Sequence, residues 1–348
     1  MSSGSDHSIG RRVFVERLVA GVALAATGAC STPPQPSSSA GWPAASESSS
    51  IELENAPSPI VDSHIHAVPC VPNLKQSPAE REKLLDAPAE AIAPALQAEM
   101  NQAGIGRAFG MGCLNGGEDD PLGIDKTIRL AGLVRGIQAI GALDPRRTDR
   151  HHLRLVERQL NKERALVVGF KAYLGYVRAG PADPGYEPYY KLAAKYSLPV
   201  IFHTGDTWSK TAKLRYAHPI GVDDVAADHP EVRFVIAHFG NPWFIDAAEV
   251  IYKNDNVWAD LSGLYVGDDK SLTDLLKQEP LPSVGSGVLI GELRNALAYA
   301  ERPERLLYGT DWPLVSMPVY RRFIEAILPK ENHQMVFRNN AEALFGPL

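Results

Sequence analysis

The chain has 348 residues, of which 45% are hydrophobic and 22% charged, a balance typical of a globular protein with one large α/β domain. Its formal net charge of -6, in a sequence without an arginine-rich tract or zinc-finger spacing, excludes the basic footprint of a nucleic-acid-binding protein. We therefore expect a small molecule, and no nucleic acid, as the partner.

The N-terminal residues carry the features of an export signal. Arg11 and Arg12 precede an apolar run of small residues at 18–29, and paired arginines before such a run are typical of the twin-arginine route. The run is shorter than an ordinary membrane span. We expect residues 1–30 to be a signal and the protein to be exported, either periplasmic or held at the cell envelope. The alternative is a disordered tail with an apolar patch.

Residues 27–30, which end in Cys30, resemble the cleavage site of a bacterial lipoprotein, although Thr27 stands where that pattern prefers Leu. Cys30 is therefore a candidate for lipidation. Residues 31–55 are rich in Pro, Ser and Ala and predict a disordered linker, which would act as a flexible tether if Cys30 were acylated. The folded domain is expected to span residues 56–348.

Residues 60–66 read Ile-Val-Asp-Ser-His-Ile-His and predict a β-strand. Alternate side chains of a strand share one face, so His64 and His66 point the same way and can share one cation, with Asp62 one step deeper. Imidazole is a common ligand of zinc-like metals, but a complete site needs three or four donors. Two nearby histidines alone are more often ordinary residues, so the pattern requires further ligands later in the chain.

From residue 60 onward, short β-branched runs alternate with segments of helical spacing, such as 88–103 and 189–196. A regular alternation of this kind predicts a parallel sheet covered by helices, and eight units predict a (β/α)8 barrel. A doubly wound open sheet is the structural alternative. The eight predicted strands are residues 60–67, 104–111, 136–143, 166–173, 198–203, 232–238, 256–261 and 305–310.

A barrel of this class carries its active site at the carboxyl ends of the strands. Residues with useful chemistry stand where several of the predicted strands end, so their side chains are expected to converge on one rim. They are His64, His66, Lys171, Tyr173, His203, His238 and Asp311.

The motifs, taken in order, resemble the amidohydrolase superfamily, and within it the amidohydrolase-related branch that includes aminocarboxymuconate semialdehyde decarboxylase. The resemblance covers residues 60–348 and implies a metal-dependent barrel enzyme. The matching pieces are Asp62-Ser63-His64-Ile65-His66, Gly169-Phe170-Lys171, Phe202-His203-Thr204-Gly205, Ala237-His238-Phe239-Gly240, Asp260-Leu261-Ser262-Gly263, Tyr308-Gly309-Thr310-Asp311-Trp312-Pro313 and the closing residues 339–346.

The resemblance also implies a ligand set for one divalent metal. Zinc suits histidine and carboxylate donors, and manganese, iron or nickel is the alternative. Asp311 would also take a proton from water activated by the metal, while His238 would polarise a substrate carbonyl. The four implied ligands are His64, His66, His203 and Asp311.

Each of these residues has an ordinary alternative role. His203 or His238 alone could be a core histidine hydrogen-bonded to backbone, and Asp311 could cap a helix after the last strand. Asp62 is expected to orient a histidine or to lie as a polar group beneath the metal rather than to bind it.

Lys171 has two possible roles within the superfamily. In binuclear relatives a lysine of the fourth strand is carboxylated and bridges two metals, whereas here we prefer a lysine that contacts substrate or a metal ligand. Lys171 and Tyr173 stand two residues apart and are both expected to line the pocket. A lysine whose stem packs at the barrel rim is the ordinary alternative.

The rim loops are expected to shape specificity. Arg178 and Trp208 are candidate substrate contacts, and the tyrosines of the loop at 175–190 suit either a planar substrate or packing of the loop itself. The long connection at 264–304 is predicted to form a lid or a contact in a homo-oligomer.

Three functions are compatible with these motifs. The preferred one is hydrolysis of an amide, ester or lactone bond of a small molecule by metal-activated water. The main alternative is a metal-dependent, non-oxidative decarboxylase on the same scaffold. The third is a metal-binding surface lipoprotein without turnover, which would not need the acid-base groups Asp311 and His238.

Overall fold

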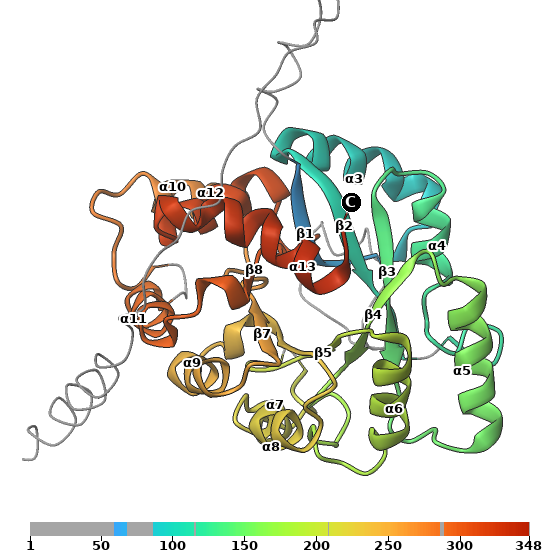
Figure 1. The fold of residues 1–348 in the computed structure, drawn as a ribbon. Coiled ribbons are helices and arrows are strands. Elements are labelled where there is room, and N and C mark those ends of the chain that lie inside the picture. Colours follow the sequence, from blue (N-terminus) through green and yellow to red (C-terminus); the bar gives the residue numbers. More distant parts are fainter. Residues whose placement is uncertain (1–58, 68–85, 115, 208, 286–288, 348) are drawn as a thin grey trace, which may run out of the picture. The chain divides into compact units, whose positions relative to one another are not determined.

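Eight parallel strands form one sheet whose order follows the sequence from β1 to β8. The computed structural model describes residues 59–67, 86–114, 116–207, 209–285 and 289–347, all within the unit Pro57–Leu348. Figure 1 shows the strands with helices around them. The strands are β1 (Ile60–His66), β2 (Ile105–Met111), β3 (Ile137–Leu143), β4 (Val167–Ala172), β5 (Val200–Phe202), β6 (Phe234–Ile236), β7 (Val257–Asp260) and β8 (Leu306–Leu307).

The sheet closes on itself where β1 meets the chain that follows β8. The backbone N–H of Ser63 donates to the Tyr308 carbonyl at 2.9 Å, and that of His66 donates to the Trp312 carbonyl at 2.7 Å. Closure leaves no unpaired edge between first and last strands. The predicted (β/α)8 barrel is thereby confirmed.

The helices form the outer layer of the barrel (Figure 1). The two helices predicted by spacing at 88–103 and 189–196 are present as α3 and α6. The helices are α3 (Ala89–Ala103), α4 (Asp125–Ala131), α5 (Arg150–Lys162), α6 (Glu187–Tyr196), α7 (Leu214–Ala217), α8 (Gly221–Asp228), α9 (Phe244–Lys253), α10 (Asp269–Leu276), α11 (Ile290–Ala300), α12 (Met317–Ile327) and α13 (Asn340–Phe345), with the short turns η2 (Ala237–Gly240), η3 (Pro303–Arg305), η4 (Lys330–Asn332) and η5 (Met335–Asn339).

Apolar side chains fill two layers. The larger layer lies between the sheet and the helices, and a smaller one fills the barrel interior with strand residues such as Val61, Ile140 and Val235. Because strands of such a sheet are buried on both faces, they appear in the sequence as nearly continuous apolar runs. This is why their positions could be predicted.

The C-terminal helix closes the end of the barrel where the strands begin. Arg107 Nη1 donates to the Gly346 carbonyl at 2.7 Å, and Arg233 Nη1 donates to the Leu344 carbonyl at 2.7 Å. The guanidinium groups thereby satisfy carbonyls at the end of α13, where positive charge is favourable. The opposite end, at the carboxyl ends of the strands, is left for a site.

The connection predicted as a lid or oligomer contact, 264–304, contains two helices of the outer layer. In it, α10 packs beside α12 and α11 beside α9. Its residues 286–288 lie outside the described residues, as do the predicted signal, Cys30, the linker and Trp208. Within the described part of the chain, no helix has the combined length and apolar character that crossing a membrane requires.

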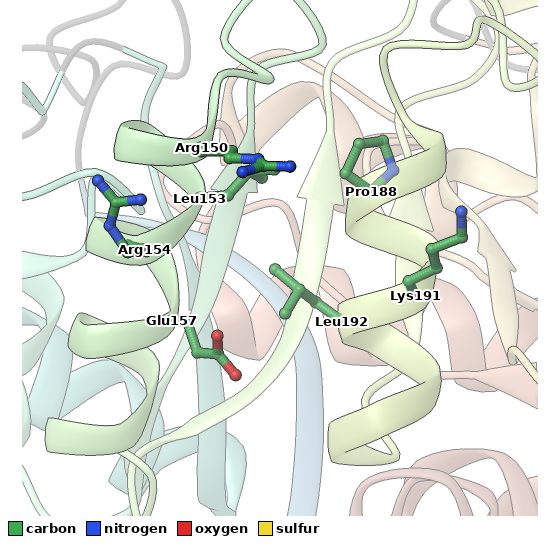
Figure 2. Close-up of a pocket in the computed structure, with 7 residues that line it drawn as sticks. All are labelled: Arg150, Leu153, Arg154, Glu157, Pro188, Lys191 and Leu192. Atoms are coloured by element: carbon green, nitrogen blue, oxygen red, sulfur yellow. The ribbon is translucent and has the colours of Figure 1, made fainter.

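The outer surface carries a groove of about 340 Å³ between α5 and α6 (Figure 2). Among the residues that the structure describes, none of those predicted for the site lines it. Its walls are formed by Arg150, Leu153, Arg154, Glu157, Pro188, Lys191 and Leu192.

Candidate metal centre

Three donors from β1 and from the residues after β8 converge at the carboxyl end of the barrel. His66 Nε2 lies 3.2 Å from Asp311 Oδ1, and His64 Nε2 lies 3.6 Å from the same oxygen. His64 and Asp311 are buried, and the side chain of His66 is 14% exposed. This group was predicted from the sequence as part of the ligand set.

The spacing of these three donors fits a divalent metal. Donors bound at about 2.0–2.1 Å to one tetrahedral ion lie roughly 3.3 Å from one another, and the two distances to Asp311 Oδ1 bracket that value. Within the described part of the chain, this buried oxygen has no hydrogen-bond partner of good geometry. A buried carboxylate oxygen without such a partner is costly unless a cation compensates it. The group of His64, His66 and Asp311 is therefore consistent with a metal site.

The backbone around Asp311 is held in an unusual conformation. Asp311 has a φ of 60°, in the left-handed region that costs a non-glycine residue about 1–3 kcal/mol. Its N–H donates to the His64 carbonyl at 2.8 Å. The preceding Thr310 is fastened to Asp62, whose carboxylate accepts the Thr310 N–H at 3.0 Å and its hydroxyl at 2.6 Å. These contacts hold the end of β8 against β1 and aim Asp311 at the histidines.

Asp62 belongs to this support. It is fully buried, and besides Thr310 its carboxylate accepts the backbone N–H of His64 at 3.1 Å. Burial raises the pKa of Asp62 to about 7. Among the described residues, Asp62 is in neither group of donors that could hold a metal.

The two ring nitrogens of His64 contact groups of opposite charge. Its Nδ1 lies 2.9 Å from Asp260 Oδ2, and its Nε2 lies 3.4 Å from the Nζ of Lys171, which is almost fully buried. Burial, aided by the positive charge of Lys171, lowers the pKa of His64 to about 3. The ring is therefore neutral at pH 7 and can offer one nitrogen lone pair to a metal.

The two carboxylates at the site remain ionised. Burial opposes the charge of Asp311, but the imidazoles of His66, His238 and His64 outweigh it and hold the pKa below its usual range. Burial likewise opposes the charge of Asp260, and its contact with His64 holds the Asp260 pKa low. The site thus combines neutral imidazoles with anionic oxygens, the donor chemistry that zinc-like ions prefer.

A second group of possible donors shares His64 with the first and adds His238 and Asp260. The Ser262 hydroxyl lies among them, with its Oγ 3.0 Å from His64 Nδ1 and 2.9 Å from His238 Nδ1, and it donates to Asp260 Oδ1. Asp260 and Ser262 had no predicted role. Their signal was the matching motif 260–263 at the end of the seventh predicted strand.

His238 adopts a left-handed backbone, with a φ of 59° and a ψ of 21°, immediately after β6. Its N–H donates to Asp260 Oδ1 at 3.0 Å, and its Nδ1 lies 3.1 Å from the Ser262 carbonyl. Burial lowers its pKa. His238 is therefore a neutral ring whose Nδ1 carries the proton, because a carbonyl oxygen can only accept.

His203 and His238 face each other through nitrogens that both lack a proton. The Nε2 of His203 lies 2.9 Å from the Asp206 carbonyl and must be the protonated nitrogen of that ring. His203 Nδ1 and His238 Nε2 are 3.2 Å apart. Two lone pairs at this distance require a proton or a cation between them, and burial lowers the pKa of both rings and so opposes the proton.

The predicted ligand His203 lies at the end of β5 but, among the described residues, in neither group of three donors. Its ring packs edge-on against Tyr176, with 4.8 Å between the ring centroids. The structure brings His203 to His238, and the ligand role of His203 stays a prediction.

Two of the predicted substrate contacts have different surroundings. Tyr173 is buried, and its hydroxyl donates to the Gly112 carbonyl at 2.5 Å, with its ring centroid 5.7 Å from Lys171 Nζ. Arg178 is exposed. Trp208, the third, is outside the described residues.

The tyrosines of the loop at 175–190 mostly pack the structure. Tyr189 donates to the Asp144 carbonyl at 3.0 Å and to the Arg147 carbonyl at 2.7 Å, and Tyr190 donates to the Pro181 carbonyl at 2.6 Å. Both are buried. For Tyr189 and Tyr190 these are packing contacts, while a substrate contact by the tyrosines of this loop stays a prediction.

Fold and site together define a (β/α)8 barrel with a candidate metal centre at the carboxyl ends of its strands. The family model described as "Amidohydrolase" matches residues 61–346. The chain belongs to this amidohydrolase family, as its motifs predicted. The sequence has no match among curated proteins.

Solved structures share the barrel at low sequence identity. An uncharacterised TIM-barrel protein from Bordetella bronchiseptica is 17% identical, with a TM-score of 0.55, covering 82% of this chain and 97% of its own. 2,6-Dihydroxybenzoate decarboxylase from Rhizobium is 16% identical, with a TM-score of 0.55 and coverages of 82% and 98%. 5-Carboxyvanillate decarboxylase from Sphingomonas paucimobilis is 14% identical, with a TM-score of 0.51 and coverages of 83% and 99%. These likenesses concern the fold.

Proposed function

We propose that this chain is a metal-dependent, non-oxidative decarboxylase of a small aromatic or enol-forming carboxylic acid. The observation that carries the proposal is the buried amino group of Lys171, whose Nζ lies 3.4 Å from His64 Nε2 beside the metal donors. A metal and a lysine side by side make a strongly electropositive site, which favours an anionic substrate. Two of the structural neighbours are named as decarboxylases of such acids.

His64, His66 and Asp311 are the residues that would hold the metal. When bound, a divalent ion supplies positive charge that polarises a coordinated oxygen of the substrate. Lys171 adds a second positive charge close to His64 and would orient the substrate carboxylate.

Decarboxylation replaces a carboxylate by hydrogen. The bond between carbon and carboxylate breaks, its electron pair stays on the ring or enol carbon, carbon dioxide leaves, and that carbon takes up one proton. Asp311 is suited to move this proton, because a carboxylate that holds the metal through Oδ1 keeps its second oxygen, Oδ2, as a proton acceptor. The proton would come from a substrate hydroxyl, pass through Asp311 to that carbon, and be replaced on the hydroxyl from water.

His238 would hold the substrate from the β6 side. Its Nδ1 donates to the Ser262 carbonyl, which leaves Nε2 as an acceptor on the side of the ring that faces His203. A neutral His238 can accept a hydrogen bond from a substrate hydroxyl and so fix the orientation of the ring.

The test is carbon dioxide release from a panel of hydroxybenzoates by the protein reconstituted with zinc or manganese. Replacing Lys171 by Met removes the charge and should lower turnover by at least about 10-fold through weaker substrate binding. The matched control is Lys191→Met, since Lys191 is an exposed lysine of α6. Hydrolysis of an ester, lactone or amide panel without carbon dioxide release would refute the proposal.

Hydrolysis is the second candidate, and the description of the matching family favours it. Asp311, holding the metal through Oδ1, could equally take a proton from water on its second carboxylate oxygen and return it to the leaving group. The same two substrate panels separate these reactions. A binding protein without turnover would release no product from either panel while retaining metal.

A further inference from the structure

The turn at the end of β7 contacts two histidines of the candidate centre at once. We infer that Asp260 is a positioning residue, which sets the tautomer of His64 so that Nε2 of this ring faces the metal. The consequence for metal binding rests on the metal site of the proposed function.

The geometry at His64 allows only one tautomer. Asp260 Oδ2 lies 2.9 Å from His64 Nδ1, and an ionised carboxylate only accepts, so Nδ1 carries the proton. In a neutral imidazole the other nitrogen then has the lone pair. That nitrogen, Nε2, is the one that lies 3.6 Å from Asp311 Oδ1.

Asp260 is held in place by donors on its other oxygen. Its Oδ1 accepts the N–H of His238 at 3.0 Å, the N–H of Ser262 at 3.1 Å and the Ser262 hydroxyl. Three donors on one oxygen fix the carboxylate plane, and the other oxygen is thereby directed at His64. Asp260 is nearly fully buried, so water does not compete for these contacts.

These contacts also decide between the two groups of possible metal donors. In the group of His64, His238 and Asp260, the atoms that face one another are already hydrogen-bonded, with the Ser262 hydroxyl among them. In the group of His64, His66 and Asp311, a carboxylate oxygen lacks such a partner within the described residues. The group of His64, His238 and Asp260 is therefore a hydrogen-bond network that orients His64. The group of His64, His66 and Asp311 contains the carboxylate oxygen that a cation would compensate.

The variant Asp260→Asn is designed to reverse the tautomer of His64. The backbone N–H groups of His238 and Ser262 require an acceptor, so the amide oxygen takes the place of Oδ1. The amide nitrogen then faces His64 Nδ1 as a donor, and the proton of His64 moves to Nε2. The lone pair for the metal is lost, although the shape of the side chain is kept.

Ser262→Ala is the matched control at the same turn. It removes the hydroxyl but keeps the Asp260 carboxylate beside His64 and the Ser262 carbonyl, which lies 3.1 Å from His238 Nδ1. Because the N–H groups of His238 and Ser262 still hold Asp260 Oδ1, the proton should stay on Nδ1 of His64 and on Nδ1 of His238 in this variant, and its metal affinity should fall less than that of Asp260→Asn.

The experiment reads the tautomers directly in the full chain without metal. Histidine is labelled with nitrogen-15, the His64 signals are assigned with His64→Gln, and long-range proton–nitrogen correlations tell protonated from unprotonated ring nitrogens. We expect Nδ1 of His64 to be protonated in the wild type and in Ser262→Ala, and Nε2 to be protonated in Asp260→Asn. Zinc affinity, measured by competition with a chromophoric chelator, should fall by about 10–100-fold in Asp260→Asn alone.

Protonation of His64 at Nε2 in the wild type would overturn the inference, whether or not Asp260→Asn folds. So would an Asp260→Asn variant with unchanged zinc affinity and tautomer. The expected tautomers in a protein that releases no carbon dioxide would refute the decarboxylase proposal while leaving the role of Asp260 intact.

Discussion

The two sides of the candidate centre offer different sets of donor atoms to a metal. On the side of β1 and β8, His64 and His66 face a carboxylate, with 3.6 and 3.2 Å between their Nε2 atoms and Asp311 Oδ1. On the side of β5 and β6, His203 and His238 face each other at 3.2 Å through nitrogens that carry no proton. The first side supplies mixed donors and negative charge, and the second supplies neutral nitrogens alone.

In His64, His203 and His238, the hydrogen-bond partner of one ring nitrogen decides whether the other nitrogen has a lone pair. Asp260 accepts a hydrogen bond from Nδ1 of His64 and so keeps the proton on that nitrogen, while the Ser262 and Asp206 carbonyls do the same for Nδ1 of His238 and Nε2 of His203. We therefore expect the β1 and β8 side to bind metal tightly, because only it adds a carboxylate to its lone pairs.

His64→Ala should largely abolish metal binding and turnover, because it removes one donor and leaves the buried Asp260 carboxylate without its partner. Metal content of the purified, folded protein by elemental analysis is the measurement. The control is His151→Ala, whose imidazole is 60% exposed on α5. Equal metal content in the two variants would contradict the assignment.

Asp311→Asn should keep a measurable part of the metal while lowering turnover by about 10²–10⁴-fold, since an amide can ligate weakly but cannot accept the proton. Steady-state kinetics and metal content are measured on the same sample. If the variant loses its metal, and reconstitution with metal restores the turnover of the wild type, Asp311 acts as a ligand only.

Gly263→Ala should disturb both sides together. An added Cβ would lie 2.8 Å from Asp311 Oδ2 and 2.8 Å from His238 Nδ1, at a φ of 59°. The free energy of unfolding in urea should fall by about 1–3 kcal/mol for the backbone alone, with turnover reduced further. Gly117→Ala is the control, because its φ is also positive while no atom lies within 4 Å of its Cβ. Equal effects of the two variants on turnover would contradict the predicted collision.

His203→Ala should have the smallest effect on metal. Because His203 is in neither group of three donors among the described residues, the tightly bound ion should remain, and turnover should fall by about 10-fold as His238 loses its neighbour. The comparison is with His66→Ala, which removes a member of the group. A loss of metal as large as in His66→Ala would establish the ligand role that the family resemblance implies.

Much of the fold followed from the sequence. Buried strands leave continuous apolar runs, so each of the eight predicted strands overlaps an observed one. The later strands are shorter than predicted because the chain leaves the sheet early. At the sixth strand, residues 232–238 were expected, but β6 ends at Ile236, since His238 and Phe239 adopt left-handed backbone.

The sequence predicted which residues form the site better than it predicted how their side chains are oriented. Their spacing predicted that His64 and His66 share one face of the first strand. Asp311 was expected near them because it stands where the eighth predicted strand ends. The nitrogen that His64, His203 and His238 each leave without a proton depends on Asp260 and on two backbone carbonyls. The contacts of His64 with Asp260 and of His238 with Ser262 join residues far apart in the chain, whereas His203 and Asp206 are only 3 residues apart. Residue type and spacing do not encode such contacts, so Asp260 and Ser262 received no role.

The most direct test of the metal centre is anomalous diffraction at the zinc edge from crystals of the zinc-loaded protein. We expect the strongest anomalous peak at bonding distance, about 2.0–2.2 Å, from His64 Nε2, His66 Nε2 and Asp311 Oδ1. A peak beside Asp260 and the Nδ1 atoms of His64 and His238, or no peak among these side chains, would contradict the assignment.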